Sequence, residues 1–131
     1  MMLHCRIVTP HGVYKEFDTP ILNIPGSDGR MGLLPNHMPL VTMLKIGQMS
    51  TEESGVRQEY AIAGGLLYFD NNLAKILTDA IENKADIDEE RAEKAKERAL
   101  SHLGSQDPDM DMRRAQIALE KAINRIRVKK G

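Results

Sequence analysis

The hydrophobic pattern of this 131-residue chain changes near Asp86, and this change constrains the fold more than any other feature. Up to about Glu82, short apolar runs alternate with Gly, Pro and Asn, as in β-strands joined by tight turns. Beyond Asp86, alanine-rich segments follow the 3.6-residue period of helices. The sequence therefore predicts an α+β chain in two parts, with residues 1–84 as a β-sandwich or barrel and residues 85–131 as an αα-hairpin.

Short strands are predicted throughout the first part. Polar and apolar side chains alternate over residues 56–62, and the runs LLYFD and LAKIL flank Asn71-Asn72 as in a two-residue hairpin. Further strands are predicted at residues 3–9, 13–17, 20–25 and 39–44, separated by Pro10, Gly12, Gly26 and Gly47.

Two amphipathic helices are predicted in the second part, joined by the linker GSQDPD. Asp86 is the predicted N-cap of the first, with Glu89 as its capping-box partner and Gly104 as its stop. The second runs from about residue 109 to 127, and each helix is expected to carry acids in its first turn. The predicted contact faces consist of Ala92, Ala95, Ala99 and Leu103 in the first helix and Met112, Ala115, Leu119, Ala122 and Ile126 in the second.

Alanine contact faces bury little apolar area, so at about 25 cal/mol per Å² the two helices gain only a few kcal/mol from pairing. One interpretation is a hairpin that can come apart. The other is a compact and stable pair, because alanine is also the best helix former.

Charge is unevenly distributed in the second helix. The chain as a whole has a net charge of −1, but residues 113–130 carry seven cations and one carboxylate, a local charge of +6. These cations form either a solvated helix face or a surface that binds acidic protein or polyphosphate. Nucleic acid is not the predicted partner, because no aromatic residue interleaves with the cations.

Several classes of function lack a signature. A single cysteine, Cys5, cannot form an internal disulfide, which favours a reducing compartment, and no run approaches the ~18 apolar residues of a membrane helix. The sequence therefore predicts a soluble chain. No P-loop, catalytic triad or paired metal-ligand spacing is present, so we predict no metal, no required cofactor and no catalytic residues; the histidines, His4, His11, His37 and His102, are scattered.

The segment GRMGLLPNHMPL, residues 29–40, contains two glycines, two prolines and a row of aliphatic residues. Glycine permits close backbone approach and proline stiffens a loop, so the segment is predicted to be a rigid, mostly apolar contact surface.

Together with AIAGGLLYFDNNLAKILTDAIENKADIDEERA and the closing A-x-x-R-[IL]-x-V at residues 122–128, this segment resembles the epsilon subunits of bacterial F-type ATP synthases. The match spans essentially the whole chain in order. Two departures are Asn36, where the family usually has glycine, and Arg30, where some members carry an acid. Asparagine also tolerates a left-handed backbone, so the turn at Asn36 is expected to persist.

The resemblance implies a non-catalytic rotor subunit. Its β-sandwich would bind the gamma subunit and rest on the c-ring, and its helices would switch between a folded state and an extended state that inhibits ATP hydrolysis by the alpha and beta subunits. It implies a chain that is a monomer alone and reaches the cytoplasmic face of the bacterial plasma membrane only through the complex. The residues that would make or support partner contacts are Met31, Leu33, Leu34, His37 and Met38 in the sandwich, with core burial as the alternative for each apolar one, and Arg113, Arg114, Lys121, Arg125 and Arg127 in the second helix.

Some members of the family bind ATP in the folded hairpin through an [IL]-D-x-x-R-A motif. The matching residues here are Ile87, Asp88, Arg91 and Ala92, with Glu82 upstream and Arg114, Lys121 and Arg125 opposite, and Lys121 replaces an arginine of the best-known binders. The resemblance leaves any role of Mg²⁺ undetermined. The alternative for the motif is a helix cap with an i, i+3 ion pair, and the alternative for the whole chain is a freestanding ATP sensor without a rotary partner.

Overall fold

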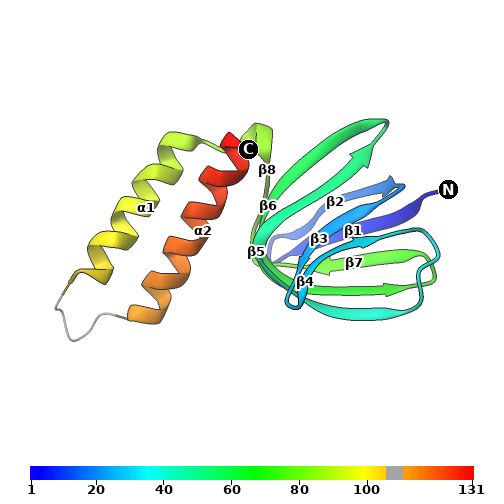
Figure 1. The fold of residues 1–131 in the computed structure, drawn as a ribbon, viewed down its shortest axis with the longest axis horizontal. Coiled ribbons are helices and arrows are strands. Elements are labelled where there is room, and N and C mark those ends of the chain that lie inside the picture. Colours follow the sequence, from blue (N-terminus) through cyan, green and yellow to red (C-terminus); the bar gives the residue numbers. More distant parts are fainter. Residues whose placement is uncertain (106–110) are drawn as a thin grey trace. The chain divides into compact units, whose positions relative to one another are not determined.

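The computed structural model describes residues 1–105 and 111–131, which form two compact units, Met1–Asn83 and Lys84–Gly131 (Figure 1). The predicted linker and the predicted start of the second helix at residue 109 lie mostly outside the described residues. Each unit is a self-contained fold. The first holds every strand, and the second holds the described helices.

The first unit is a β-sandwich, which settles the choice between sandwich and barrel. Its strands follow the order β2-β1-β7-β6-β5-β3-β4, with β8 paired to β6, and all neighbours are antiparallel except β1 and β7. The strand bounds are β1 Leu3–Thr9, β2 Gly12–Thr19, β3 Leu22–Gly26, β4 Gly29–Leu33, β5 Leu40–Glu53, β6 Val56–Asp70, β7 Leu73–Leu77 and β8 Ile81–Asn83.

The sheet folds back so that side chains of β2 contact β5 directly. The backbone N–H of Glu52 donates to the Thr19 hydroxyl at 3.0 Å, and the Lys15 ammonium lies 2.7 Å from the Glu53 carboxylate. Tyr60 also donates to Glu53 at 2.7 Å. Partial burial opposes the charge on Lys15, but its hydrogen bonds to Glu53 and Tyr60 raise its pKa overall, whereas burial raises the pKa of Tyr60 to about 12.

The core lies between the two layers and follows the alternation of the strands. Leu3, Cys5 and Ile7 of β1 are fully buried, while His4 and Arg6 between them face outward. Burial raises the pKa of the Cys5 thiol to about 12, so this cysteine is an inert core residue.

The structure confirms most of the predicted strands and corrects two expectations. Strands β1 and β7 match their predicted bounds, and Asn71 and Asn72 adopt left-handed backbone with φ of 49° and 62° at the hairpin turn. Residues 29–33 are not part of a loop, because they pair with β3 as β4. Gly47 does not end a strand: it lies inside β5, where a Cβ would come 2.8 Å from the Cβ of Pro25.

The second unit contains a short 3₁₀ helix, η1 (Lys84–Asp86), followed by α1 (Glu89–Leu103) and α2 (Met112–Lys130), which lie side by side (Figure 1). Gly104 caps α1 as predicted. The predicted N-cap was wrong, because Asp86 belongs to η1 and Asp88 caps α1 instead. Within the described residues, the first turn of α2 also lacks the expected acids, and Asp111 before it is the N-cap.

The contact between α1 and α2 consists mainly of small side chains, as the spacing predicts. The buried residues of the two helices are Ala92, Ala99, Ala115, Ala122, Asn124 and Val128. Met112 is half-exposed, so its predicted place in the seam was wrong, and Asn124 and Val128 were missed. A seam of this composition buries little area per turn of helix.

Candidate functional site

The I-D-x-x-R-A motif lies at the start of α1. The Asp88 carboxylate accepts a hydrogen bond from the Arg91 backbone N–H at 3.1 Å, in the extended conformation of an N-cap residue. Ile87 and Ala92 are buried. Ile87 and Ala92 thus pack the helix, and the exposed side chains of the N-cap Asp88 and of Arg91 are the ones that can meet a ligand.

The basic residues of α2 lie at different heights along the hairpin. Lys130 approaches Glu89 at 3.3 Å, and the Lys129 ammonium donates to the Lys84 carbonyl at 3.1 Å, so the end of α2 lies beside the start of α1. Arg125 lies between one and two turns before the C-terminal end of α2 and is partly buried. The structure therefore brings Arg125 toward the motif.

Arg114 and Lys121 are further from the motif. At about 1.5 Å per residue, Arg114 lies roughly 16 Å along α2 from Arg125, so the two arginines extend from positions about three turns apart. Lys121 lies one turn from Arg125 and is partly buried. Glu82 belongs to β8, in the other compact unit. The remaining predicted contact residues, Arg113 and Arg127, are exposed on α2.

The predicted contact segment of the sandwich divides between core and surface. Leu33 is fully buried in β4, as the alternative of core burial predicts, and it supports the segment from inside. Leu34 and Met38 are 55% and 74% exposed. Met31 is partly buried and packs against the core.

The turn between these exposed residues is tightly held. Asn36 has φ of 63°, so its left-handed conformation is confirmed, and its backbone N–H donates to the Asn72 side chain at 2.9 Å. The exposed His37 ring lies edge-on to Phe69, with centroids 6.2 Å apart, and its Nδ1 lies 2.8 Å from the Met38 carbonyl oxygen. Leu34 and Met38 are therefore presented from a rigid turn.

A second apolar surface was missed in the sequence. We call it the apolar sheet surface; it spans β5, β6 and β7 on the outer face of the sandwich. Val41 and Met43 are 61% and 65% exposed, and Tyr68 and Leu77 are also exposed. The register places Val41 opposite Tyr68, and Met43 and Leu77 on either side of Leu66. Alternation within residues 40–44 was the available signal, but it does not tell which face is covered.

A charged cluster occupies the outer face of β1 and β2. The His4 ring contacts Asp18 at 2.8 Å and Glu16 at 3.1 Å, and Arg6 contacts Glu16 at 2.9 Å. These hydrogen bonds, first that to Asp18, raise the pKa of His4, and hydrogen bonds from His4 and Arg6 lower the pKa of Glu16.

Neither a metal site nor a membrane span is apparent in the described part of the chain. No group of three or more His, Cys, Asp or Glu residues within residues 1–105 and 111–131 is arranged to hold a metal ion. Within the same ranges, no helix has both the length and the apolar character needed to cross a bilayer.

Two family models match the chain, one after the other. Residues 2–84 match the β-sandwich domain of the ATP synthase delta/epsilon chain, and residues 85–130 match the long α-helix domain of the same chain. The chain belongs to the ATP synthase delta/epsilon family. The boundary between the two matches lies one residue from the division between the compact units.

Relatives within this family cover nearly the whole chain. The ATP synthase epsilon chain of Desulforamulus reducens is 42% identical over 121 residues, 92% of each chain. The ATP synthase epsilon chain of Pediococcus pentosaceus is 40% identical over 133 residues, 98% of this chain and 96% of that one.

Solved structures show the same fold. A chain in the cryo-EM structure of the Euglena gracilis mitochondrial ATP synthase, described as OSCP/F1/c-ring, superposes with a TM-score of 0.79 at 25% identity, covering 94% of this chain and 78% of that chain. A chain of the Tetrahymena thermophila central stalk and c-ring structure has a TM-score of 0.59 at 14% identity, covering 97% and 92%, which supports the fold alone.

Proposed function

We propose that this chain is the central-stalk epsilon subunit of a bacterial F-type ATP synthase, with no catalytic activity of its own. The observation that carries this proposal is the consecutive match of both family domains over residues 2–84 and 85–130. The names of the bacterial relatives and the source of the Euglena match point to the same complex. Its partners would be the gamma subunit, the c-ring and the alpha and beta subunits, which hold it at the cytoplasmic face of the membrane.

The sandwich offers two surfaces for these partners. The apolar sheet surface presents Val41, Met43 and Tyr68 to solvent, and the turn after β4 presents Leu34 and Met38. Exposed apolar groups clustered in this way mark protein interfaces. We assign the apolar sheet surface to the gamma subunit and the turn to the c-ring or to gamma where it borders the ring.

The helical unit is the proposed regulatory element. Its seam is built mostly from alanine, so the folded hairpin is only slightly more stable than an extended arrangement. Arg113, Arg114 and Arg127 are exposed and suited to acidic surfaces of the alpha and beta subunits. In this proposal the extended helices inhibit ATP hydrolysis and the folded hairpin permits it.

ATP is the proposed ligand of the folded hairpin. Arg91 of α1 and Lys121 and Arg125 of α2 would hold its phosphates, and bridging the two helices would stabilise the folded state. Asp88 would act both as helix cap and as a ligand group. Arg114 is the member of the predicted set whose placement gives least support to this site.

Co-purification of the tagged chain with separately produced gamma subunit tests the stalk assignment. We expect a one-to-one complex. The double substitution Val41→Gln with Met43→Gln should weaken it at least tenfold, because both apolar side chains would be lost from the centre of the proposed interface. Val56→Gln is the matched control, since Val56 is equally exposed but lies at the β5–β6 turn. Absence of any complex favours the freestanding ATP sensor, and an equal loss with the control refutes the assigned surface.

A further inference from the structure

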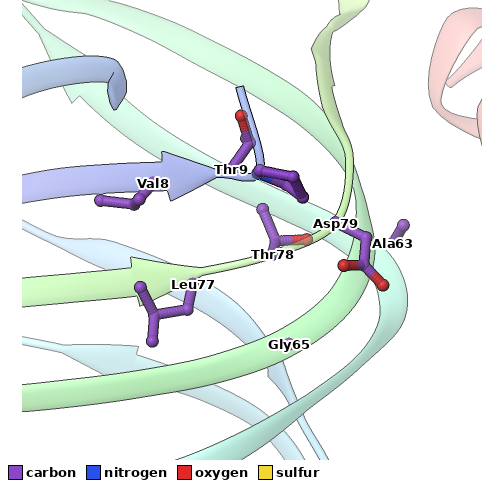
Figure 2. Close-up of a pocket in the computed structure, with 8 residues that line it drawn as sticks. Val8, Thr9, Ala63, Gly65, Leu77, Thr78 and Asp79 are labelled. Carbon is purple, nitrogen blue, oxygen red and sulfur yellow. The ribbon is translucent and has the colours of Figure 1, made fainter. Parts of the chain in front are cut away.

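A pocket of about 300 Å³ opens on the sandwich where the parallel strands β1 and β7 end (Figure 2). One wall is apolar and comes from Val8, Pro10 and Leu77. Thr9, Thr78 and Asp79 supply the polar atoms. In the close-up, the side chains of Val8 and Leu77 lie toward one end and the Asp79 carboxylate toward the other, so the pocket is amphipathic along its length.

Small residues of β6 leave this space unfilled. Ala63 and Gly65 line the pocket with one methyl group and no side chain, respectively. Gly65 has φ of +134°, and a Cβ there would come 2.0 Å from the Leu77 carbonyl oxygen. No larger residue fits at Gly65 without moving β7, so the close approach of β6 and β7 fixes the shape of the pocket.

The polar groups of the pocket are hydrogen-bond acceptors whose own hydrogens are already used. The Thr9 hydroxyl donates to the Gly12 carbonyl at 3.3 Å and accepts the His11 backbone N–H at 3.2 Å with one of its two lone pairs, and the Thr78 hydroxyl donates to the Ala80 carbonyl at 3.2 Å. The Thr78 backbone N–H donates to Val8 at 3.0 Å. Asp79 is exposed, and its carboxylate has no hydrogen-bond or ion-pair partner among the residues that the structure describes.

A pocket whose side-chain polar groups act as acceptors, with one carboxylate and an apolar wall, matches a cation on an alkyl stem. Lysine and arginine have this chemistry, because their methylene stems cover apolar surface while the head group donates hydrogen bonds. The pocket also joins the apolar sheet surface, since Leu77 belongs to both. A residue of whatever chain covers that surface would therefore reach the pocket directly.

We propose that this pocket receives a lysine or arginine side chain of the gamma subunit and fixes its position on the sandwich. The head group pairs with Asp79 and the hydroxyl oxygens of Thr9 and Thr78, and the stem lies against Val8 and Leu77. This inference rests on the proposed stalk function for the identity of the partner, but the chemistry of the pocket stands without it.

The affinity for purified gamma subunit tests the occupant. Asp79→Asn keeps the shape of the side chain and removes its charge, and it should weaken binding about five- to tenfold and flatten the dependence on salt. Asp79→Glu should retain more affinity than Asp79→Asn. Asp28→Asn is the matched control, because it removes the same charge at an exposed turn between β3 and β4 and should leave affinity unchanged. Equal affinities for wild type and Asp79→Asn, or equal losses with Asp28→Asn, would overturn the proposal.

A second measurement tests whether the pocket binds a cation when the gamma subunit is absent. Titration of the ¹⁵N-labelled full chain with millimolar agmatine, an alkyl stem with a guanidinium at one end and an ammonium at the other, should shift the amide signals of Thr9, Thr78 and Asp79, and Asp79→Asn should abolish these shifts. Scattered shifts, or the same shifts in Asp79→Asn, would overturn the pocket as a cation site. Specific agmatine shifts in a chain that fails to bind gamma would instead locate the failure in the proposed stalk function.

Discussion

Asp88 is the residue at which the two interpretations of the I-D-x-x-R-A motif give different results. Its carboxylate caps α1 by accepting the Arg91 N–H at 3.1 Å, so Asp88→Ala should destabilise the helical unit by about 1 kcal/mol even without nucleotide. Asp88→Asn retains a capping oxygen and loses the charge at the helix N-terminus, which should cost only about 0.3–1 kcal/mol. The seam consists of small residues and contributes little stability, so the loss of the cap should be measurable in the unfolding of the helical unit.

ATP separates capping from ligand binding. At a concentration ten times its Kd, ATP would stabilise the folded hairpin by about 1.4 kcal/mol. If the carboxylate touches the nucleotide, Asp88→Asn should lose most of this ATP-dependent gain in addition to its small cost without nucleotide. Thermal melting followed by circular dichroism at 222 nm, with and without ATP, measures both quantities.

Asp111 provides the matched control for this experiment. It caps α2 in the same way, accepting the Arg114 N–H at 3.1 Å, and lies outside the motif. Asp111→Ala should therefore cost about 1 kcal/mol and leave the ATP-dependent gain unchanged. A full ATP response in Asp88→Asn would show that Asp88 is a cap only, and unchanged stability of Asp88→Ala would refute the capping argument itself.

Three further outcomes are expected in the sandwich. Leu33→Ala should lower the free energy of unfolding by about 2–5 kcal/mol in urea, whereas Leu34→Ala should change it by no more than about 0.5 kcal/mol, and similar effects would refute their division between core and surface. Gly65→Ala should cost more than Gly29→Ala in the same assay, because both have positive φ but only Gly65 would clash with β7. The raised pKa of His4 means that its stabilising contribution is complete below about pH 6.5 and is lost as pH rises through its higher folded value. An NMR titration of the His4 ring checks this direction, and a pKa at or below the ordinary value would contradict it.

Local patterns predicted the elements whose stabilising contacts are close in sequence. The spacing of Ala92 and Ala99 predicted the buried face of α1, and Asn71-Asn72 predicted the turn between β6 and β7. Both signals depend on a few neighbouring residues. Periodicity and turn chemistry therefore sufficed for them.

Features that depend on distant residues were missed. Glycine usually marks the end of a strand, but Gly47 lies inside β5. A glycine is needed there because Pro25 of β3 approaches it closely. Strand β4 and the parallel pairing of β1 with β7 are likewise set by partners far along the chain. The exposure of Val41 and Met43 could not be predicted, because alternation shows two faces without showing which one is covered.

The candidate nucleotide site shows the same limit. The residue types of the motif were apparent in the sequence, whereas the proximity of Arg125 to the motif follows from the end of α2 lying beside the start of α1. Capping was also misassigned by two residues, because the 3₁₀ turn at Lys84–Asp86 delays the start of α1. Residue identity thus predicted candidates, and the backbone determined which of them lie near one another.

The central claim is that a gamma-binding sandwich carries helices that control ATP hydrolysis. The most direct test is the hydrolysis rate of a reconstituted assembly of alpha, beta and gamma subunits, measured with the full chain and with a chain truncated after Asn83. We expect the full chain to lower the rate and millimolar ATP to relieve that inhibition, while the truncated chain binds without inhibiting. Equal rates with both chains, when both are bound, would contradict the account.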